Sequence, residues 1–294
     1  MMIRFWGVRG TIASPGADTA KVGGNTSCVE VACEGSGGEV TRIALDAGTG
    51  LRGFGDSLLA EAARQATPER PPRVKLSLLF SHYHWDHIQG LPLFAPLYLP
   101  GTELDVFGPN FGGGVEGVLR AQMQAPVFPV EYSELASRVR ARDLASGQSL
   151  EIGCARVTTA RLNHPGGVFG YRVEHAGRSV VYATDTEHYA CADPALVRLA
   201  QHADVLIYDA MYLPEEYRGE TCMSKVGWGH STFEAAAEVA LKAGVRRLVL
   251  FHHDPCRDDW AVVELESRAR QLFPNSVAAR EGQVLDLPLD ACAA

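Results

Sequence analysis

The sequence lacks a hydrophobic run long enough to cross a membrane, which takes roughly 18 or more apolar residues in succession. The longest candidate, Val74 to Phe80, is short and is interrupted by Lys75. The opening residues, MMIRFWGVRG, contain arginines and glycines where a signal peptide requires an apolar stretch. We therefore expect a protein of the cytoplasm without a membrane partner.

Cysteines are few and are not arranged in pairs. There are seven of them, an odd number scattered along the chain, and no C-x-x-C pair occurs. The sequence also has no low-complexity segment, no short-period repeat and no linker of the composition that separates domains. We expect reduced thiols and a single domain over residues 1–294.

Positive charge is in deficit: 27 Lys and Arg residues stand against 35 Asp and Glu residues, which gives a net charge of -8 at pH 7. A protein that holds long nucleic acid through its overall field needs the opposite balance, so no such partner is expected, although a local basic patch remains open. Hydrophobic residues make up 46% of the 294 positions. That share is ordinary for a globular protein and excludes a disordered or fibrous chain.

Short apolar segments typical of strands alternate along the chain with segments of helical periodicity. Strands are expected at residues 3–6, 27–32, 42–45, 74–80, 104–107, 155–162, 168–174, 178–183, 204–208, 246–250 and 277–286. Helices are expected at 51–64, 115–124, 131–142, 194–201, 231–243 and 258–272. Ser231 or Thr232 would cap the helix at 231–243. This alternation predicts an α/β protein in which two sheets are sandwiched between helices.

The densest group of chemically active side chains is SHYHWDH at residues 81–87, directly after the apolar segment 74–80. In an extended backbone His82 and His84 point to the same side, because they lie two positions apart. Asp86 and His87 follow where the chain is expected to turn into a helix, so they can face a second point nearby. Four such ligands on one turn fit two adjacent metal ions better than one. The alternative, a histidine-rich surface turn, is disfavoured by this density behind a buried strand.

With this block, the chain resembles the metallo-β-lactamase superfamily almost from end to end. Five recurring elements of that family occur here in order: Asp46 in ALDAG, the H-x-H-x-D-H block at 82–87, His164 in NHPG, Asp185 in ATDT and His252 in LFHH. The resemblance implies an αββα four-layer sandwich, in which two mixed β-sheets are flanked by helices.

The resemblance also implies how two divalent metal ions are held. One ion would take His82, His84 and His164, the other would take Asp86, His87 and His252, and Asp185 would bridge them. Asp46 would orient a ligating imidazole without touching a metal itself. His253 is the alternative to His252 as the last ligand, and the register after the preceding strand favours His252. Zinc suits such mixed nitrogen and oxygen sites, and manganese or iron remain open.

A second match concerns Asp209 in IYDA and His230 in GHST, which resemble an acidic residue and a histidine of ribonuclease Z-like phosphodiesterases. In those enzymes the histidine, oriented by the carboxylate, stabilises the phosphate and can protonate the leaving oxygen. Such a step suits hydrolysis of a phosphodiester by a hydroxide that bridges the metals, with Asp86 also among the catalytic residues. The alternative is a purely structural role, in which His230 lies at the N-terminus of a helix and Asp209 caps the end of a strand.

Two features of the sequence narrow the range of expected substrates. Members that process transfer RNA carry a long arm between the third and fourth elements, but here His164 and Asp185 are only 21 positions apart. The opening FWGVRG, with GGNTS at 23–27, is similar to bacterial phosphodiesterases of cyclic nucleotides and cyclic phosphates. The expected partner is therefore a small phosphodiester, and by the same resemblance the chain is expected to form a homodimer.

Candidate substrate contacts lie near these motifs. Arg9 and Lys225 could bind a phosphate or a sugar, and Trp228 or Tyr212 could stack on a base. Solvated charges and ordinary packing are the alternatives. Segment 101–150 could form a wall or lid that sets specificity. Two other functions stay open: another hydrolase of the same scaffold, such as a thioesterase, lactonase or β-lactamase, and a binding protein without turnover.

Overall fold

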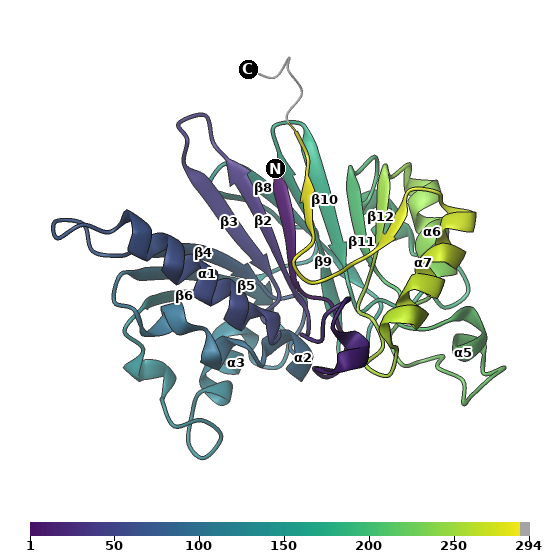
Figure 1. Cartoon of the computed structure of the whole chain (residues 1–294), viewed down its shortest axis with the longest axis horizontal. Helices are drawn as coiled ribbons and strands as arrows, with labels where there is room; N and C mark the ends of the chain where they lie inside the picture. The colour runs from purple at the N-terminus through teal and green to yellow at the C-terminus, as the bar shows by residue number, and fades with distance from the viewer. Residues whose placement is uncertain (289–294) are drawn as a thin grey trace.

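A computed structural model describes residues 1–288 as two seven-stranded β-sheets packed face to face, with helices on both outer faces (Figure 1). The first sheet has the order β14 (Val284–Asp286), β1 (Met2–Gly7), β2 (Cys28–Glu34), β3 (Val40–Leu45), β4 (Val74–Leu79), β5 (Thr102–Pro109) and β6 (Arg138–Leu144). The second has the order β13 (Ser276–Ala278), β12 (Arg247–Phe251), β11 (Val205–Asp209), β10 (Arg178–Ala183), β9 (Val168–His175), β8 (Ala155–Leu162) and β7 (Ser149–Ile152). Both sheets mix parallel and antiparallel pairs, so the predicted αββα sandwich is confirmed.

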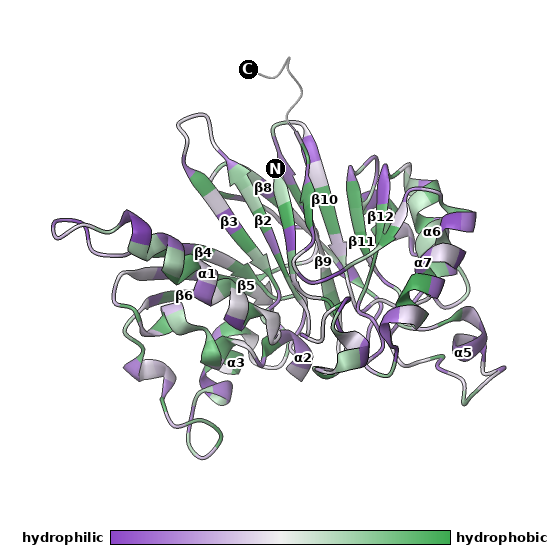
Figure 2. Cartoon of the chain, in the orientation of Figure 1, coloured by the Kyte–Doolittle hydropathy of each residue, from purple (hydrophilic) through white to green (hydrophobic). Residues whose placement is uncertain are grey.

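The space between the sheets is filled by alternate side chains of their strands. On β1, Ile3 and Phe5 are fully buried, whereas Met2, Arg4 and Trp6 point the other way and are partly exposed. Strand β11 is buried along its whole length. That pattern is expected of a strand in a parallel group that is covered on both faces. Figure 2 shows the corresponding concentration of hydrophobic residues on inner strands such as β11 and β12.

Helices cover the outer face of each sheet. The first sheet is covered by α1 (Gly50–Gln65) and α3 (Gly114–Gln122), and the second by α4 (Pro194–Leu199), α6 (Phe233–Ala243) and α7 (Asp259–Leu272). The buried face of α1 carries apolar residues at three- and four-residue spacing, as a helix on a sheet requires. Helix α6 begins after Thr232, whose hydroxyl accepts a hydrogen bond from the Ala235 amide, so Thr232 rather than Ser231 is its N-cap.

Shorter elements complete the described chain. They are α2 (Trp85–Ile88), α5 (Pro214–Arg218) and the 3-10 turns Ala17–Thr19, Leu91–Leu93, Ala95–Tyr98 and Tyr132–Glu134. No helix within residues 1–288 is long and apolar enough to span a membrane. The six cysteines of this part are free thiols. Cys292 and the end of the expected domain 1–294 lie outside the described residues.

The expected helix at 131–142 is wrong, because Tyr132–Glu134 form a 3-10 turn and the positions from Arg138 on belong to the edge strand β6. Arg138, Arg140 and Arg142 share one face of this strand, and Val139 and Ala141 lie against the core of the first sheet. Between α3 and β7, the segment Arg138–Leu144 is thus part of the sheet. A helical period and an edge strand rich in charge are hard to tell apart over so few residues.

The expected strand at 277–286 is in fact two strands. β13 ends the second sheet and β14 ends the first, and the chain crosses between them at 279–283. Gly282 makes this crossing with a φ of 78°, a conformation that favours glycine. The C-terminal segment therefore links the two sheets at their edges, where β14 pairs with β1.

The strands that precede the sequence motifs end at one side of the sandwich. β3 and β4 run parallel in the first sheet, and β10, β11 and β12 run parallel in the second. In folds of this class, ligands bind beyond the carboxyl ends of such strands. In Figure 1 this end carries α2, whereas the N-terminus lies at the opposite end.

Candidate metal centre

The histidine block follows the end of β4, as predicted. His84 has an extended backbone and is the N-cap residue of α2, which contains Asp86 and His87. The change from extended to helical backbone turns the later pair toward a different point from the earlier one. His82, Asp86 and His87 are buried, whereas His84 is exposed.

Seven metal-competent side chains converge in two groups, although they come from distant segments. The first group is His82, His84 and His164, and the second is Asp86, His87, Asp185 and His252; within each, the ligand atoms lie within 4.8 Å of one another. Nε2 of His164 lies 3.1 Å from Nδ1 of His84. In the second group the Nε2 atoms of His87 and His252 are 3.3 Å apart.

Asp185 lies between the two groups and presents one carboxylate oxygen to each. Its Oδ1 is 3.2 Å from Nε2 of His87 and 3.2 Å from Nε2 of His252. Its Oδ2 is 3.6 Å from Nε2 of His82 and 4.0 Å from Nε2 of His164. This arrangement suits a carboxylate shared by two cations.

The donor set fits divalent metal ions. Nε2 of His82 is buried and has no hydrogen-bond partner among residues 1–288, so a bound metal ion would satisfy an otherwise unpaired nitrogen. Burial, followed by the neighbouring His87, holds the pKa of His82 well below its ordinary value. Burial alone would raise the pKa of Asp185, but the surrounding imidazoles hold it well below its ordinary value. Burial alone would lower the pKa of His87, but the carboxylates in turn raise it well above its ordinary value, so a metal ion, which binds a neutral imidazole, would displace the proton of that ring.

Asp46 is fully buried and holds one imidazole of the second group. Its Oδ2 accepts hydrogen bonds from Nδ1 of His87 at 2.8 Å, from the Tyr182 hydroxyl at 2.8 Å and from the Ser81 hydroxyl at 2.7 Å. Its Oδ1 accepts one from the Ser81 amide at 2.7 Å. These bonds commit Nδ1–H of His87 to Asp46 and leave Nε2 for the cluster. Tyr182 and Ser81 were not among the residues predicted from the sequence.

Replacing Asp46 with alanine is expected to lower zinc affinity by about 10- to 100-fold, since His87 loses the partner that orients it. The same change leaves the Ser81 amide and the Tyr182 hydroxyl without their hydrogen-bond acceptor. It should therefore lower the free energy of unfolding by about 3 kcal/mol. Competitive chelator titration and chemical unfolding of the metal-free protein measure the two effects. Tyr182→Phe is the control, because it keeps the His87 contact and should leave zinc affinity near wild type. Wild-type zinc affinity in Asp46→Ala would contradict the orienting role.

Three residues of the cluster have left-handed backbones although they are not glycines. Asp46 has a φ of 63°, Asp185 of 50° and His252 of 60°. Such conformations cost on the order of 1–3 kcal/mol each and persist only where the surrounding structure holds them. Asp46 directly follows β3 and His252 directly follows β12, whereas Asp185 lies two positions after the end of β10. A side chain at Gly10 would lie 2.4 Å from Nδ1 of His252, so this close approach requires glycine.

His230 and Asp209 also reach the cluster. Nδ1 of His230 donates to Oδ2 of Asp209 at 2.8 Å, and the His230 ring stacks on that of His252 with centroids 5.0 Å apart. Burial alone would lower the pKa of His230, but the Asp209 carboxylate and those of the cluster raise it to about 9. Within residues 1–288 no hydrogen bond engages Nε2 of His230, which leaves that nitrogen for a ligand.

His253 and Arg9 lie inside the fold and not in the cluster. Nε2 of His253 bonds to the Ala279 carbonyl at 3.0 Å, and burial lowers the pKa of this imidazole to about 3, so His252 is the residue that joins the group. Arg9 is fully buried, and its guanidinium donates to the carbonyls of Gly23 and Asp254 at 2.8 and 3.1 Å. The structure therefore corrects the expectation that Arg9 contacts a substrate: it ties the N-terminal loop to the loop after β12.

Lys225 and Trp228 lie on the loop that leads to His230. The Lys225 ammonium is 4.2 Å from the centroid of the Trp228 ring and 5.8 Å from that of Tyr212. Half of the Trp228 surface is exposed, and the Tyr212 ring lies 5.9 Å from that of His230. The Tyr212 ring thus lies near both the Lys225 ammonium and the His230 imidazole.

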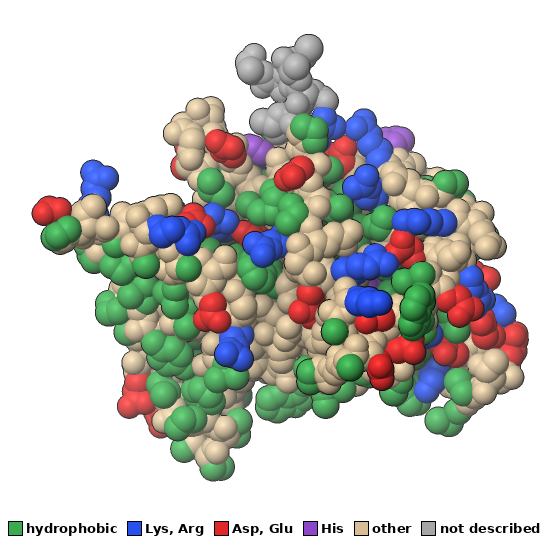
Figure 3. All heavy atoms as spheres, in the orientation of Figure 1, with side chains coloured by type: hydrophobic (Ala, Val, Ile, Leu, Met, Phe, Trp, Pro, Cys, Tyr) green, Lys and Arg blue, Asp and Glu red, His purple; other side chains and the backbone are tan. Residues whose placement is uncertain are grey.

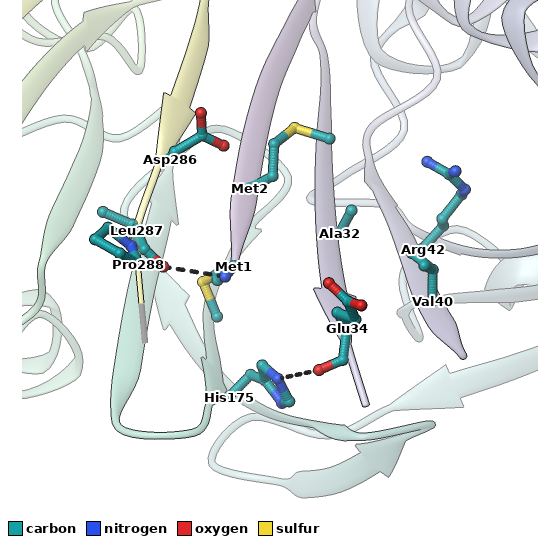
Figure 4. A pocket seen from close by; sticks show the side chains of 10 residues that line it. All are labelled: Met1, Met2, Ala32, Glu34, Val40, Arg42, His175, Asp286, Leu287 and Pro288. Atoms are coloured by element: carbon teal, nitrogen blue, oxygen red, sulfur yellow. Dashed lines mark hydrogen bonds between the residues drawn. The ribbon is translucent and has the colours of Figure 1, made fainter. Parts of the chain in front are cut away.

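A cavity of about 430 Å³ lies near the N-terminus, away from this cluster (Figure 4). Met1, Met2 and Leu287 contribute apolar surface to it, and His175 lies at its edge. Both ring nitrogens of His175 are engaged at 2.9 Å by backbone carbonyls, those of Cys154 and Glu34. Both ring nitrogens of this histidine are therefore occupied by contacts within the fold, and neither is available to bind a metal.

Comparison with known proteins agrees with the geometry. Residues 41–253 match the family described as the Beta-lactamase superfamily domain. Ribonuclease Z of Limosilactobacillus reuteri (strain DSM 20016) is 25% identical over 279 residues, covering 76% of this chain and 84% of that protein. The structure of Zn(2+)-bound PqqB from Methylobacterium extorquens matches with a TM-score of 0.68 and 18% identity, over 98% of this chain and 100% of the other. A diphosphatase from the PhnP family matches with a TM-score of 0.67 and 19% identity, over 98% of each chain.

The family match covers most of the chain, and it spans all five sequence elements and ends at the last residue of the fifth, His253. The two groups of ligands that the structure assembles are complete and consistent with a dinuclear site. The chain belongs to the β-lactamase superfamily and, with this intact His/Asp cluster, is a metal-dependent hydrolase of the metallo-β-lactamase fold, distantly related to ribonuclease Z.

Proposed function

We propose that the chain is a dinuclear metal-dependent phosphodiesterase that acts on a small phosphodiester, with a cyclic nucleotide or cyclic phosphate as the favoured class. The observation that carries this proposal is the His230–Asp209 pair, which lies against the cluster with Nε2 of His230 free of hydrogen bonds to the described part of the chain. A phosphodiester needs a proton or a counter-charge at its leaving oxygen, and this pair can supply it.

Bound divalent ions, zinc in the first instance, would supply Lewis acidity toward the phosphate oxygens and toward the attacking water. The residues of the chain would hold these ions and supply the proton. His82, His84, His164, Asp86, His87, Asp185 and His252 would hold the ions. His230 would donate its Nε2 proton to the oxygen that leaves when the phosphorus–oxygen bond breaks, and Asp209 would keep the opposite nitrogen protonated.

A small substrate is supported by what separates His164 from Asp185. Strands β9 and β10 and the tight turn at Ala176–Gly177 occupy nearly all of that interval, so no arm for gripping transfer RNA is inserted there. On the face drawn in Figure 3, side chains of both charge signs are interspersed. Such a surface does not favour a long polyanion, which requires a continuous basic track.

Lys225 and Trp228 are the substrate contacts we propose for this site. A compact anion needs only one or two charge-assisted donors, and an exposed indole offers a face on which a base can stack. The homodimer, the cytoplasmic location and the role of segment 101–150 in specificity remain predictions from the sequence.

A substrate panel tests the proposal. With Zn²⁺ or Mn²⁺ supplied, we expect hydrolysis of bis-p-nitrophenyl phosphate and of at least one compact diester among 2′,3′- and 3′,5′-cyclic nucleotides, cyclic dinucleotides and phosphoribosyl cyclic phosphate. A thioester, a lactone and nitrocefin are the controls. Faster turnover of a thioester or lactone than of every diester would replace the phosphodiesterase with another hydrolase of the same fold. Inertness of the metal-replete protein toward the whole panel would favour a binding role.

A further inference from the structure

Glu187 is a buried carboxylate, two positions after the shared Asp185, to which the steps above assign no task. The side chain is fully buried. Its Oε1 accepts hydrogen bonds from the Tyr217 hydroxyl and the Gly227 amide, both at 2.7 Å, and its Oε2 accepts one from the Gly229 amide at 2.8 Å. All three donors are neutral, so hydrogen bonds from uncharged groups hold this carboxyl group inside the fold.

These hydrogen bonds hold in place the loop at residues 227–229, which directly precedes His230. The Gly229 amide binds Glu187, while the Gly229 carbonyl lies 2.8 Å from Nδ1 of His164. Gly229 also has a φ of 87°, and a side chain there would lie 2.3 Å from that same nitrogen. One residue thus connects Glu187 to a metal-competent imidazole, and the next residue in the chain is His230.

The backbone of Glu187 makes a second connection to the same imidazole. Its amide donates to the Asn163 carbonyl at 2.8 Å, directly before His164. The Asn163 side-chain amide in turn donates to the Glu187 carbonyl at 3.4 Å. Three segments of the site, at 163–164, 185–187 and 227–230, therefore meet at Glu187.

A carboxylate suits this position better than its amide. Glutamine has one acceptor oxygen in place of two, and its NH₂ group would face an amide N–H on one side. A glutamine at 187 would lose at least one of the two glycine contacts and could not hold Gly227 and Gly229 together. If only packing mattered, an amide of the same size would serve equally well.

We propose that Glu187 is a positioning residue: its carboxylate anchors the 227–229 loop and so sets the orientation of His164 toward the metal and of His230 toward the substrate. The part that concerns His230 rests on the proposed phosphodiesterase function. The part that concerns His164 does not, because it is a statement about metal binding alone.

The test compares zinc binding in Glu187→Gln, Tyr217→Phe and the matched control Glu220→Gln. Glu220 is an exposed carboxylate on the same loop, bonded to Arg218. In chelator-competition titrations, Glu187→Gln is expected to bind one of its two zinc ions about 10- to 100-fold more weakly and to retain the other, because only the group that contains His164 is disturbed. Tyr217→Phe, which keeps both glycine contacts, should fall between wild type and Glu187→Gln, and Glu220→Gln should match wild type.

Two further readouts distinguish positioning from general stability. The Nδ1–H proton signal of His164 should shift or broaden in the NMR spectrum of Glu187→Gln, and kcat on bis-p-nitrophenyl phosphate should fall more than KM rises. Wild-type affinity for both zinc ions in Glu187→Gln overturns the proposal. So does an equal weakening of both ions, which general loosening of the fold would cause. If Glu187→Gln does not fold, Tyr217→Phe decides: selective weakening of one ion supports the proposal, and unchanged binding of both refutes it.

The zinc readout separates this proposal from the choice of substrate. If phosphodiesters prove not to be substrates while one zinc ion is selectively weakened in Glu187→Gln, the proposed function fails and the positioning of His164 stands. If diesters are hydrolysed and both ions bind as in wild type, the function stands and the positioning role fails.

Discussion

Replacing His82 with alanine is expected to abolish metal loading of the first group of ligands and, with it, turnover. The His82 imidazole is buried beside the other ligands of its group, and its Nε2, which has no hydrogen-bond partner in the described chain, lies 3.6 Å from the shared Asp185 carboxylate. Without it, the first group keeps two histidines and one oxygen of Asp185. Loss of the ion removes several kcal/mol of transition-state stabilisation, so turnover should fall by on the order of 10³-fold or more.

Elemental analysis and the rate of bis-p-nitrophenyl phosphate hydrolysis, measured on the same preparation, check this result. His202→Ala is the matched control, because His202 is exposed and lies outside both groups of ligands. It should keep wild-type zinc content and rate. A His82→Ala protein that is folded and still carries two zinc ions would end the case for this cluster as the metal centre.

Replacing His230 with alanine is expected to leave both metal ions bound and to slow turnover by about 10²- to 10⁴-fold, the usual contribution of a positioned proton donor. The imidazole is held by Asp209 at 2.8 Å and stacks on His252, but all seven proposed ligands remain in the variant. Asp209→Asn should have a smaller effect, since it weakens the orientation of His230 without removing the proton.

Comparing substrates with different leaving groups tests more directly whether His230 donates a proton. p-Nitrophenolate is already stable as an anion, whereas an alkoxide departs only with a proton. His230→Ala should therefore lose more activity on a diester with an alkyl leaving group than on bis-p-nitrophenyl phosphate. Equal losses on both substrates would assign His230 to phosphate binding, and a wild-type rate in the zinc-loaded variant would refute the assignment as proton donor.

Local patterns predicted much of the fold because most elements here have a strong period of their own. The buried face of α1 and the alternation along β1 follow directly from the spacing of apolar residues. The pattern was insufficient at β6, where charged residues alternate with small apolar ones at the edge of a sheet. An edge strand forms because it pairs with a neighbouring strand. β6 pairs with residues 103–109 of β5, which are too distant in the sequence for a local pattern to include them.

Arg9 illustrates the same limit for single residues. A glycine-flanked arginine near the N-terminus is suited to bind an anion, yet its guanidinium donates to carbonyls up to 248 positions away. An isolated cationic side chain carries no sign of whether it meets solvent, a ligand or the backbone of a distant loop. Lys225, by contrast, lies with Trp228 on the same short loop, so its neighbourhood is local.

The primary structure alone marked the ligands of the 82–87 block, because their donor atoms and their spacing are set by a few neighbouring residues, and the resemblance to a family implied the distant ligands. The assembled fold established how those ligands are oriented. Asp46 and Tyr182 are 136 positions apart, and Glu187 meets Gly229 across 42. Contacts of that range arise from the pairing of strands and the packing of two sheets, and spacing along the chain carries no trace of them.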